Sequence, residues 1–362
     1  MGAFERAVSV VALSSVLACG RSVRDDAVLD ASAGRAGLDG GDLDSGPSDA
    51  PSSDGACGAA RPLCDVDRCA EGECTFVEIA RLPEPVWGTY PDEDHVYAIA
   101  EQGTSIFRVP KCGGEPEVIV RTVGNIDGLA ISRDLLYWTL SAGPVRRLFR
   151  TPKDGSGATE ELTLEGRAPD YTSIIADDTG AYVIRSESPG IVRYEATELV
   201  VLEGAPVRAT LLADREFLYT TNYDEGTRRV NKRDGSSVLL LEPGELPAAA
   251  DERALYYVVY DPPDTAGSWP SYVLYALPKD ASPPEPLRYL DQQTRGVGDG
   301  HCLYLLQSHS VTGGTVTATL RLRLDGAGQS ELWSGTQLHS VSLSEDTCYL
   351  AERDGSIYRR PK

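Results

Sequence analysis

Histidine is the side chain most often used for acid–base chemistry near neutral pH, and this chain of 362 residues has four. They are His95, His301, His309 and His339, and no two have the spacing of metal ligands on one element. The sequence also lacks the GxSxG, HExxH, Walker A and GxGxxG motifs of common hydrolases, metalloproteases and nucleotide-binding enzymes. We therefore predict no catalytic residue and no cofactor.

Asn125 and Asp127 form the one N-x-D pair that could offer oxygen ligands to a metal at the mouth of a channel. The same residue types are common in turns, where their side chains bond to the local backbone. We favour the turn interpretation and predict no metal site.

Eight cysteines divide into an N-terminal one, a dense cluster and three isolated ones. The cluster has the spacing C-x6-C-x4-C-x4-C, which favours two disulfides in an exported chain; zinc would favour C-x2-C pairs. Without the N-terminal Cys19, seven cysteines remain. Seven is an odd number, so at least one thiol stays free or joins another chain, and the sequence does not give the connectivity. The disulfide candidates are Cys57, Cys64, Cys69, Cys74, Cys112, Cys302 and Cys348.

The rest of the chain, from residue 75 onward, has a repeated pattern marked by a tyrosine every 37 to 48 residues. An Asp or Ser stands five residues before each tyrosine. Seven copies of a unit of this length predict an all-β fold, a seven-bladed β-propeller of four-stranded blades, with six or eight blades as alternatives. The tyrosines are Tyr97, Tyr137, Tyr182, Tyr219, Tyr256, Tyr304 and Tyr349.

The second copy shows the expected blade most clearly. Its strands a to d, from the channel outward, are predicted at residues 128–131, 135–140, 146–151 and 160–164. The tyrosine lies on strand b, where we expect a buried ring with a hydrogen-bonded hydroxyl. The preceding Asp or Ser is expected to open the a–b turn, and a Pro-Lys-Asp-Gly sequence ends strand c.

The last copy has only three strands, at residues 339–343, 347–351 and 356–360. The segment 75–81 offers a fourth at the opposite end of the repeats. We predict that it completes the seventh blade and closes the ring, because closure removes an exposed strand edge.

The sequences LYWT at 136–139 and LFRTPKDG at 148–155 resemble the YWTD propellers of extracellular receptors, and DGLA at 127–130 resembles the motif of NHL-type propellers. The resemblance implies a propeller over most of residues 75–362. It also implies a binding or scaffolding role.

Residues 1–18 include a 12-residue apolar run that is too short to span a bilayer but suits a signal peptide. The run ends in VLACG at 16–20, which resembles the bacterial lipobox and implies lipidation of Cys19. The alternative is an ordinary secretory signal with an incidental cysteine. Gly20 favours the outer membrane over the inner one.

Residues 19–56 begin with this cysteine and continue as an Asp-, Ser- and Gly-rich stretch without aromatic residues, which predicts a disordered tether. Residues 57–74 form the cysteine-rich segment, and residues 75–362 form the propeller. The net charge of −21 argues against nucleic-acid partners and against docking of the protein surface on anionic lipid. Contact with the membrane is therefore expected through the lipid alone.

A propeller has two faces, which we call bottom, with the a–b and c–d turns, and top, with the b–c and d–a loops. Cys112, Cys302 and Cys348 are expected on the bottom face under blades six, seven and one, with the cysteine-rich segment docked there. We predict the binding surface on the top face around blades five and six, where residues 261–270 and 307–315 are expected to form long b–c loops. Candidate ligand-binding residues are Trp87, Asp127, Tyr171, Arg208, Trp269, Arg295, His309 and His339.

Two functional hypotheses follow. The first is an extracytoplasmic cell-envelope lipoprotein whose propeller binds a protein, peptide or glycan without catalysis, and we prefer it. The second is a metal- or His-assisted propeller hydrolase or lyase. Arg208 and Arg295 could draw an anionic group to the channel mouth. Alternatively, they pair with neighbouring acids and the long loops are tolerated insertions.

Overall fold

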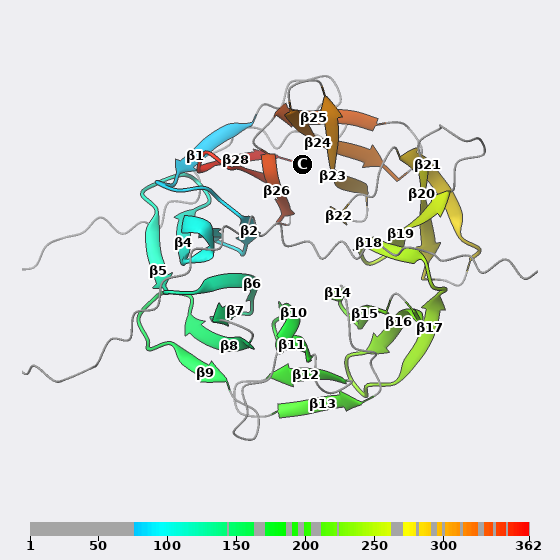
Figure 1. Cartoon of the computed structure of the whole chain (residues 1–362), viewed down its shortest axis with the longest axis horizontal. Helices are drawn as coiled ribbons and strands as arrows, with labels where there is room; N and C mark the ends of the chain where they lie inside the picture. The colour runs from blue at the N-terminus through cyan, green and yellow to red at the C-terminus, as the bar shows by residue number, and fades with distance from the viewer. Residues whose placement is uncertain are drawn as a thin grey trace, which may run out of the picture. The chain divides into compact units, whose positions relative to one another are not determined.

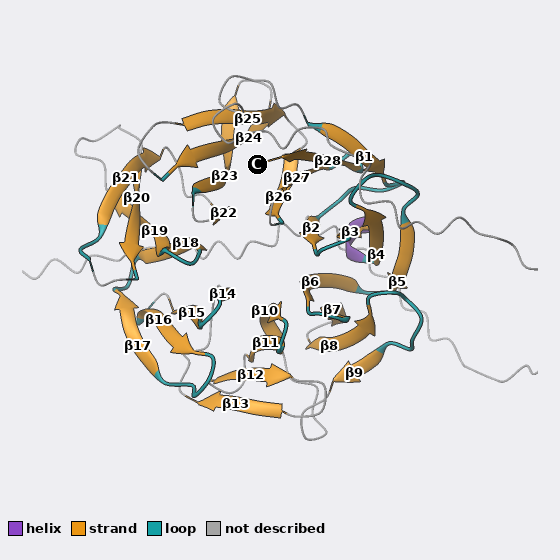
Figure 2. Ribbon diagram, turned by 180° about the vertical axis from the view of Figure 1, so that it is seen from behind, coloured by secondary structure: helices purple, strands orange, loops and turns teal. Residues whose placement is uncertain are grey.

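The computed structural model describes residues 76–142, 145–162, 171–185, 190–194, 199–203, 211–222, 224–261, 271–279, 282–290, 295–298, 301–311, 314–324, 329–335, 338–344 and 347–361. These residues form seven antiparallel four-stranded sheets arranged in a ring, a seven-bladed β-propeller (Figure 1; Figure 2 shows the opposite face). The predicted fold class and blade number are confirmed. Among the described residues, no helix has the length and hydropathy needed to cross a bilayer.

The first four blades follow the chain in order, with strand a innermost. Blade 1 contains β2 (Gly88–Pro91), β3 (His95–Ala100), β4 (Ser105–Pro110) and β5 (Glu117–Arg121), with a 3-10 turn at Glu101–Gly103. Blade 2 contains β6 (Asn125–Ile131), β7 (Leu135–Ala142), β8 (Val145–Pro152) and β9 (Glu160–Leu162). Blade 3 contains β10 (Tyr171–Asp177), β11 (Gly180–Arg185), β12 (Gly190–Tyr194) and β13 (Leu199–Glu203). Blade 4 contains β14 (Leu211–Ala213), β15 (Phe217–Asn222), β16 (Gly226–Asn231) and β17 (Ser237–Leu241).

The remaining three blades complete the ring. Blade 5 contains β18 (Glu245–Ala250), β19 (Ala254–Asp261), β20 (Ser271–Pro278) and β21 (Glu285–Leu290). Blade 6 contains β22 (Arg295–Gly298), β23 (Cys302–Val311), β24 (Gly314–Arg323) and β25 (Gln329–Gly335). Blade 7 contains β26 (Leu338–Leu343), β27 (Thr347–Glu352), β28 (Ser356–Pro361) and β1 (Val77–Arg81).

Burial along a blade follows the position of the strand. In β3, strand b of blade 1, five consecutive residues are buried, because a strand between two neighbouring blades has no solvent face. In β5, strand d of the same blade, only Val120 is buried, because this outermost strand keeps one edge in water. The short aliphatic and aromatic side chains of the b strands suit such two-sided burial.

The core lies between the blades. The buried apolar residues fall into seven clusters in the described part of the chain, and each cluster joins two neighbouring blades. Each repeated tyrosine belongs to the cluster between its own blade and the next, and all seven rings are at most 2% exposed. The predicted structural role of the tyrosines is therefore confirmed.

Strand β1 closes the ring, as predicted. It pairs antiparallel with β28, from Val77 opposite Arg359 to Arg81 opposite Ser356. Phe76, directly before β1, packs edge-on against Trp333 of blade 6 with ring centres 5.5 Å apart. The N-terminal strand therefore completes blade 7 and contacts blade 6.

Blade 6 differs from the sequence prediction. We expected a loop at 307–315, but β23 continues to Val311 and β24 begins at Gly314. His309 pairs with Val316, and Ser310 pairs with Thr315. The blade therefore carries a long β-hairpin in place of the loop. Residues 262–270, most of the other expected loop, lie outside the described residues.

Candidate functional site

A cavity of about 680 Å³ lies at the bottom end of the channel, where the a–b turns of blades 3 to 6 meet. Carboxylates dominate its wall: Asp177 and Asp178 come from blade 3, Asp214 from blade 4, and Asp251 and Glu252 from blade 5. Lys232 and Arg215 are the cationic residues of the lining. What this cavity can do depends on how many of the acids are already engaged.

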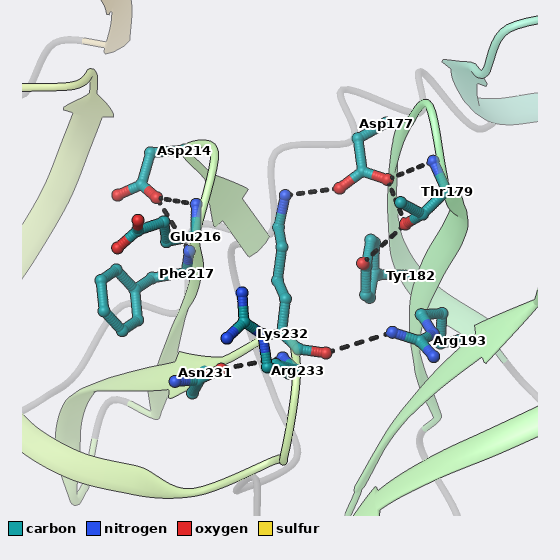
Figure 3. A network of polar contacts seen from close by, with 10 residues as sticks. All are labelled: Asp177, Thr179, Tyr182, Arg193, Asp214, Glu216, Phe217, Asn231, Lys232 and Arg233. Carbon is teal, nitrogen blue, oxygen red and sulfur yellow. Dashed lines mark hydrogen bonds and ion pairs between the residues drawn. The ribbon is translucent and has the colours of Figure 1, made fainter.

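Each described aspartate that opens an a–b turn is held by its own turn. Asp177 Oδ1 accepts the Thr179 N–H at 2.9 Å and the Thr179 hydroxyl at 2.6 Å. Asp214 Oδ1 accepts the backbone N–H groups of Glu216 and Phe217, both at 2.8 Å (Figure 3). The predicted turn role of these acids agrees with these bonds.

The second carboxylate oxygen reaches a lysine of the next blade. Lys232 Nζ of blade 4 lies 2.6 Å from Asp177 Oδ2 of blade 3 (Figure 3). Lys279 of blade 5 contacts Asp214 of blade 4 at the same distance. Lys153 of blade 2 also contacts Asp92 of blade 1 at 2.6 Å. The same ion pair therefore joins three pairs of neighbouring blades in the described part of the chain, blades 1 and 2, 3 and 4, and 4 and 5.

An arginine completes the repeated arrangement. In every blade except blade 5, the residue opposite the repeated tyrosine on strand c is arginine; in blade 5 it is Ala276. Arg193 donates to the Lys232 carbonyl at 3.2 Å, and Arg108 donates to the Lys153 carbonyl at 3.0 Å. The lysine of each of these c–d turns therefore makes two contacts with the preceding blade. Its ammonium pairs with the aspartate of that blade, and its carbonyl accepts a hydrogen bond from the arginine.

The electrostatics of the cavity follow from these contacts. Burial alone would raise the pKa of Asp177 and Asp214. The hydrogen bonds from the lysines, with those from Thr179 to Asp177 and from Tyr219 to Asp214, outweigh burial and hold each pKa below the ordinary carboxyl value. Both groups are therefore ionised and paired, which suits a structural role better than proton transfer.

These inter-blade contacts were missed by the sequence analysis, although the sequence holds a signal. The chain has five lysines. In each case, the residue three positions earlier lies on strand c, directly opposite the repeated tyrosine of its blade. A residue type confined to one position of a repeat indicates a repeated contact. These lysines are Lys111, Lys153, Lys232, Lys279 and Lys362.

The top end of the channel brings two predicted binding residues together. Trp87 precedes β2 and is 41% exposed. Its ring meets that of His339, on β26, edge to face with centres 5.2 Å apart. Burial, together with the nearby Arg353, lowers the pKa of His339, so its imidazole is neutral at physiological pH.

Asp127 lies on strand β6 of blade 2. Its carboxylate accepts a hydrogen bond from Ser141 and pairs with Arg146 Nε at 3.0 Å. The turn interpretation is therefore wrong for Asp127, because its carboxylate contacts side chains of the neighbouring strands β7 and β8 and not the local backbone. Within the described residues, no three His, Cys, Asp or Glu side chains are grouped to hold a metal ion.

The other predicted binding residues are placed only in part. Tyr171 begins β10, Arg295 begins β22, and His309 lies within β23; these positions are described, but not the side chains. Arg208, Trp269, Cys19, Cys57, Cys64, Cys69 and Cys74 lie outside the described residues.

The three described cysteines lie near blades 6, 7 and 1. Cys302 on β23 and Cys348 on β27 are buried in the cluster between blades 6 and 7, and neither forms a disulfide, which differs from the prediction for these two residues. Cys112 lies in the turn between β4 and β5, which contacts blade 7 because Arg359 donates to the Lys111 carbonyl at 3.0 Å. Arg360, the next residue after Arg359, is opposite Cys348. Cys112 and Cys348 therefore lie at the same end of adjacent blades.

Comparison with known proteins identifies the fold. No protein-family model and no curated protein sequence matches the chain. Virginiamycin B lyase from Staphylococcus aureus, in a catalytically inactive variant with quinupristin, is 13% identical with a TM-score of 0.57 over 80% of this chain and 99% of that one. YCF48 bound to D1 peptide is 10% identical with a TM-score of 0.54 over 80% and 97%.

PorZ of Porphyromonas gingivalis, a bacterial surface component of the type-IX secretion system, is 12% identical with a TM-score of 0.52 over 78% of this chain and 37% of that one. At these identities, the similarity shows a β-propeller fold and nothing finer.

Proposed function

We propose that this chain is a non-catalytic binding protein of the bacterial cell envelope. In this proposal its propeller is held outside the cytoplasm by a lipid on Cys19. The top face, around blades 5 and 6, then binds a protein, peptide or glycan. One observation carries the binding role: the top face exposes aromatic side chains. The aspartates at the starts of the a–b turns in the bottom cavity, by contrast, are already engaged in hydrogen bonds and ion pairs within the propeller.

Two aromatic residues support this. Trp87 is held by its backbone N–H, which donates to the Ile99 carbonyl at 2.8 Å, while its ring stays exposed. Tyr260 on β19 is 49% exposed and packs edge-on against Tyr272 at 5.7 Å. Exposed aromatic rings on a rigid backbone are typical anchors for ligands, because little entropy is lost when they are covered. The peptide bound to YCF48 shows that a fold neighbour takes such a ligand.

The test is capture of a partner from envelope extracts by the propeller without its tether. We expect capture to fall when Trp269, Arg208 and Arg295 are replaced by Ala. Arg215→Ala, on the exposed bottom rim, is the matched control and should capture normally. Unchanged capture by the triple variant with intact folding would remove the top face from consideration.

Anchoring rests on the lipobox resemblance and on the tether composition of residues 19–56. The surface location of PorZ supports the envelope, and Gly20 supports the outer membrane. We expect Cys19→Ser to move the protein from the detergent phase to the aqueous phase and to abolish labelling by a radioactive fatty acid. Unchanged labelling would contradict the anchor.

We also propose disulfides among Cys57, Cys64, Cys69, Cys74 and Cys112, because the cluster is dense and Cys112 is exposed in its turn on blade 1. Peptide mapping without reduction would identify the pairs. A spectrum in which all five are alkylated without a reductant would contradict this.

A metal- or His-assisted lyase or hydrolase is the second candidate. The neutral His339 beside exposed Trp87 favours it, since a neutral imidazole can accept a proton, and virginiamycin B lyase shares the fold. Stoichiometric calcium or zinc in the purified protein, lost on Asp127→Ala, would favour this candidate. Metal-free protein would favour the binding role.

A further inference from the structure

Strand a carries a β-bulge near its top end in both blade 2 and blade 7. In β6 the extra residue is Asp127, where the register with β7 shifts. In β26 the extra residue is His339, where the register with β27 shifts. A bulge re-aims the side chain of its extra residue. The two residues therefore hold equivalent positions at the channel mouth and can be compared directly.

In blade 2 the bulged residue meets an arginine of the b–c hairpin, since Asp127 pairs with Arg146 Nε at 3.0 Å. The b–c turn of blade 7 also carries an arginine, Arg353, which is exposed. Burial lowers the pKa of His339 and the positive charge of Arg353 lowers it further, which places the guanidinium near the imidazole. Blade 7 therefore repeats the arginine but has a neutral imidazole where blade 2 has a carboxylate.

The acids on either side of Arg353 are engaged elsewhere. Glu352 accepts a hydrogen bond from the Trp333 indole at 3.2 Å. Asp354 lies 3.8 Å from Arg81 of β1. In the part of the chain that the structure describes, no carboxylate lies within ion-pair distance of Arg353. Its guanidinium is therefore open to a carboxylate from outside the chain.

Trp87 ends a rigid segment that packs on the same turn. Residues 82–87 read LPEPVW, and Leu82 and Val86 are buried while Trp87 is 41% exposed. The Leu82 N–H donates to the Gly355 carbonyl of the blade 7 turn at 2.9 Å. Two prolines restrict the backbone of the segment, so the exposed indole is held in place before a ligand arrives.

The imidazole of His339 offers one hydrogen bond to such a ligand. Its Nδ1 is buried and has no hydrogen-bond partner among the described residues. A buried N–H without an acceptor is less favourable than a buried lone pair, so we assign the proton to Nε2. Because Nδ1 is buried, Nε2–H is the group that can reach a ligand beside the Trp87 ring, whose centre is 5.2 Å from that of the imidazole.

The charge of the chain favours a peptide over an acidic glycan as the source of the carboxylate. The net charge is −21. A glycan of uronic acids carries a negative charge on each sugar, so this protein would repel it. A peptide delivers one terminal carboxylate, and its other residues can be neutral or basic.

We propose that Arg353, His339 and Trp87 bind the C-terminal end of a peptide whose last residue is apolar or aromatic. The terminal carboxylate takes the place beside Arg353 that the Asp127 carboxylate takes beside Arg146. It also accepts the Nε2–H of His339, while the last side chain covers the Trp87 ring. Arginine suits this role because its planar donors match a carboxylate. This inference rests on the proposed binding function of the top face, and it names the ligand class and the residues that hold it.

The test uses the full chain with Cys19→Ser and a labelled probe, the acetylated peptide Lys-Thr-Ser-Lys-Ser-Phe with a free C-terminal carboxylate. Two further probes are the same peptide with a C-terminal amide and a trimer of galacturonic acid. Arg353→Gln removes the cation at an exposed position, and His339→Asp supplies an internal carboxylate like that of Asp127. Arg233→Gln, at an exposed arginine of the blade 4 turn, is the matched control for loss of charge.

We expect Arg353→Gln, His339→Asp and the C-terminal amide each to weaken binding by about tenfold or more, since a charge-assisted hydrogen bond is lost or its site is filled. Arg233→Gln should bind within about twofold of the parent. Equal binding of acid and amide, equal binding by Arg353→Gln, or no binding of the acid by a folded parent would overturn the proposal. So would tighter binding of the galacturonate trimer than of the peptide, since the ligand would then be an acidic glycan.

Partner capture from envelope extracts separates this inference from the proposed function. If capture falls in the variant without Trp269, Arg208 and Arg295 but not in Arg353→Gln, this inference fails and the proposed function stands. Capture that falls in both variants supports the two together.

Discussion

At the scale of single residues, the most consequential contacts are the ion pairs between neighbouring blades. Asp214 has only 1% of its side chain exposed, and Lys279 Nζ lies 2.6 Å from it. The carboxylate also accepts the Tyr219 hydroxyl at 2.6 Å. Loss of the ammonium would leave a buried charge with fewer compensating partners, so this pair should matter more than exposed ones.

We predict that Lys279→Met lowers the free energy of unfolding by about 1–3 kcal/mol, measured by urea denaturation. Arg233→Met, at an exposed position of the blade 4 turn, is the control and should change it by less than about 0.5 kcal/mol. Asp214→Asn added to Lys279→Met should restore part of the loss, because it removes the unpaired charge. Equal effects of Lys279→Met and Arg233→Met would contradict a role for the pair.

The lowered pKa of Asp214 makes its contribution depend on pH. Its stabilisation is present above the ordinary carboxyl pKa of 3.8 and is lost as pH falls through the lower folded value. The stability difference between the parent and Lys279→Met should therefore be full at pH 7 and should shrink below about pH 4. Urea denaturation across this range measures it. A difference that grows on acidification would have the wrong sign for this account.

The sequence predicted the local part of these contacts and missed the long-range part. An aspartate that bonds backbone two and three residues away follows from turn chemistry, as at Asp214 with Glu216 and Phe217. The ion pair from Lys232 to Asp177 joins residues 55 positions apart in different blades. Its existence depends on how far each c–d turn reaches beneath the preceding blade, which local patterns do not specify.

At the scale of elements, strand β1 is the element on which ring closure depends. Ile79 and Ala80 are buried in the cluster between blades 7 and 1, while Val77 on the same strand is 37% exposed. Burial along β1 does not alternate residue by residue, because the register with β28 shifts between Glu78 and Ala80. A charge should therefore be tolerated at one position and not at the other.

We predict that Ile79→Asp lowers the free energy of unfolding by about 3 kcal/mol or more, since it buries an unpaired charge. Val77→Asp should cost less than about 1 kcal/mol. Thermal unfolding of both variants measures this. Similar melting temperatures for the two would mean that β1 does not close the ring in solution.

The same scale shows where prediction from sequence is limited. The closing strand was predicted because the last copy of the repeat has only three strands, whereas a blade has four. The blade 6 hairpin was predicted as a loop because Ser308, Ser310 and Gly314 are common in loops. Cross-strand pairing overrode these preferences, with Ser308 opposite Thr317 and Val311 opposite Gly314.

At the scale of the whole molecule, the repeat determined what could be predicted. Seven tyrosines at similar spacing specify seven blades, because each ring fills the interface with the next blade. Binding surfaces are the parts that differ between blades, so the repeat carries no information about them. Of the predicted top-face residues, the described side chains of Trp87 and His339 pack together, whereas Asp127 is held by Arg146 in blade 2.

The central claim is that the partner binds the top face and not the bottom cavity. Photo-crosslinking in the intact envelope tests it most directly, with a photoreactive amino acid placed at Tyr260 on the top face or at Arg215 beside the bottom cavity. The account predicts a specific adduct from position 260 and none from position 215. An adduct from position 215 alone would contradict it.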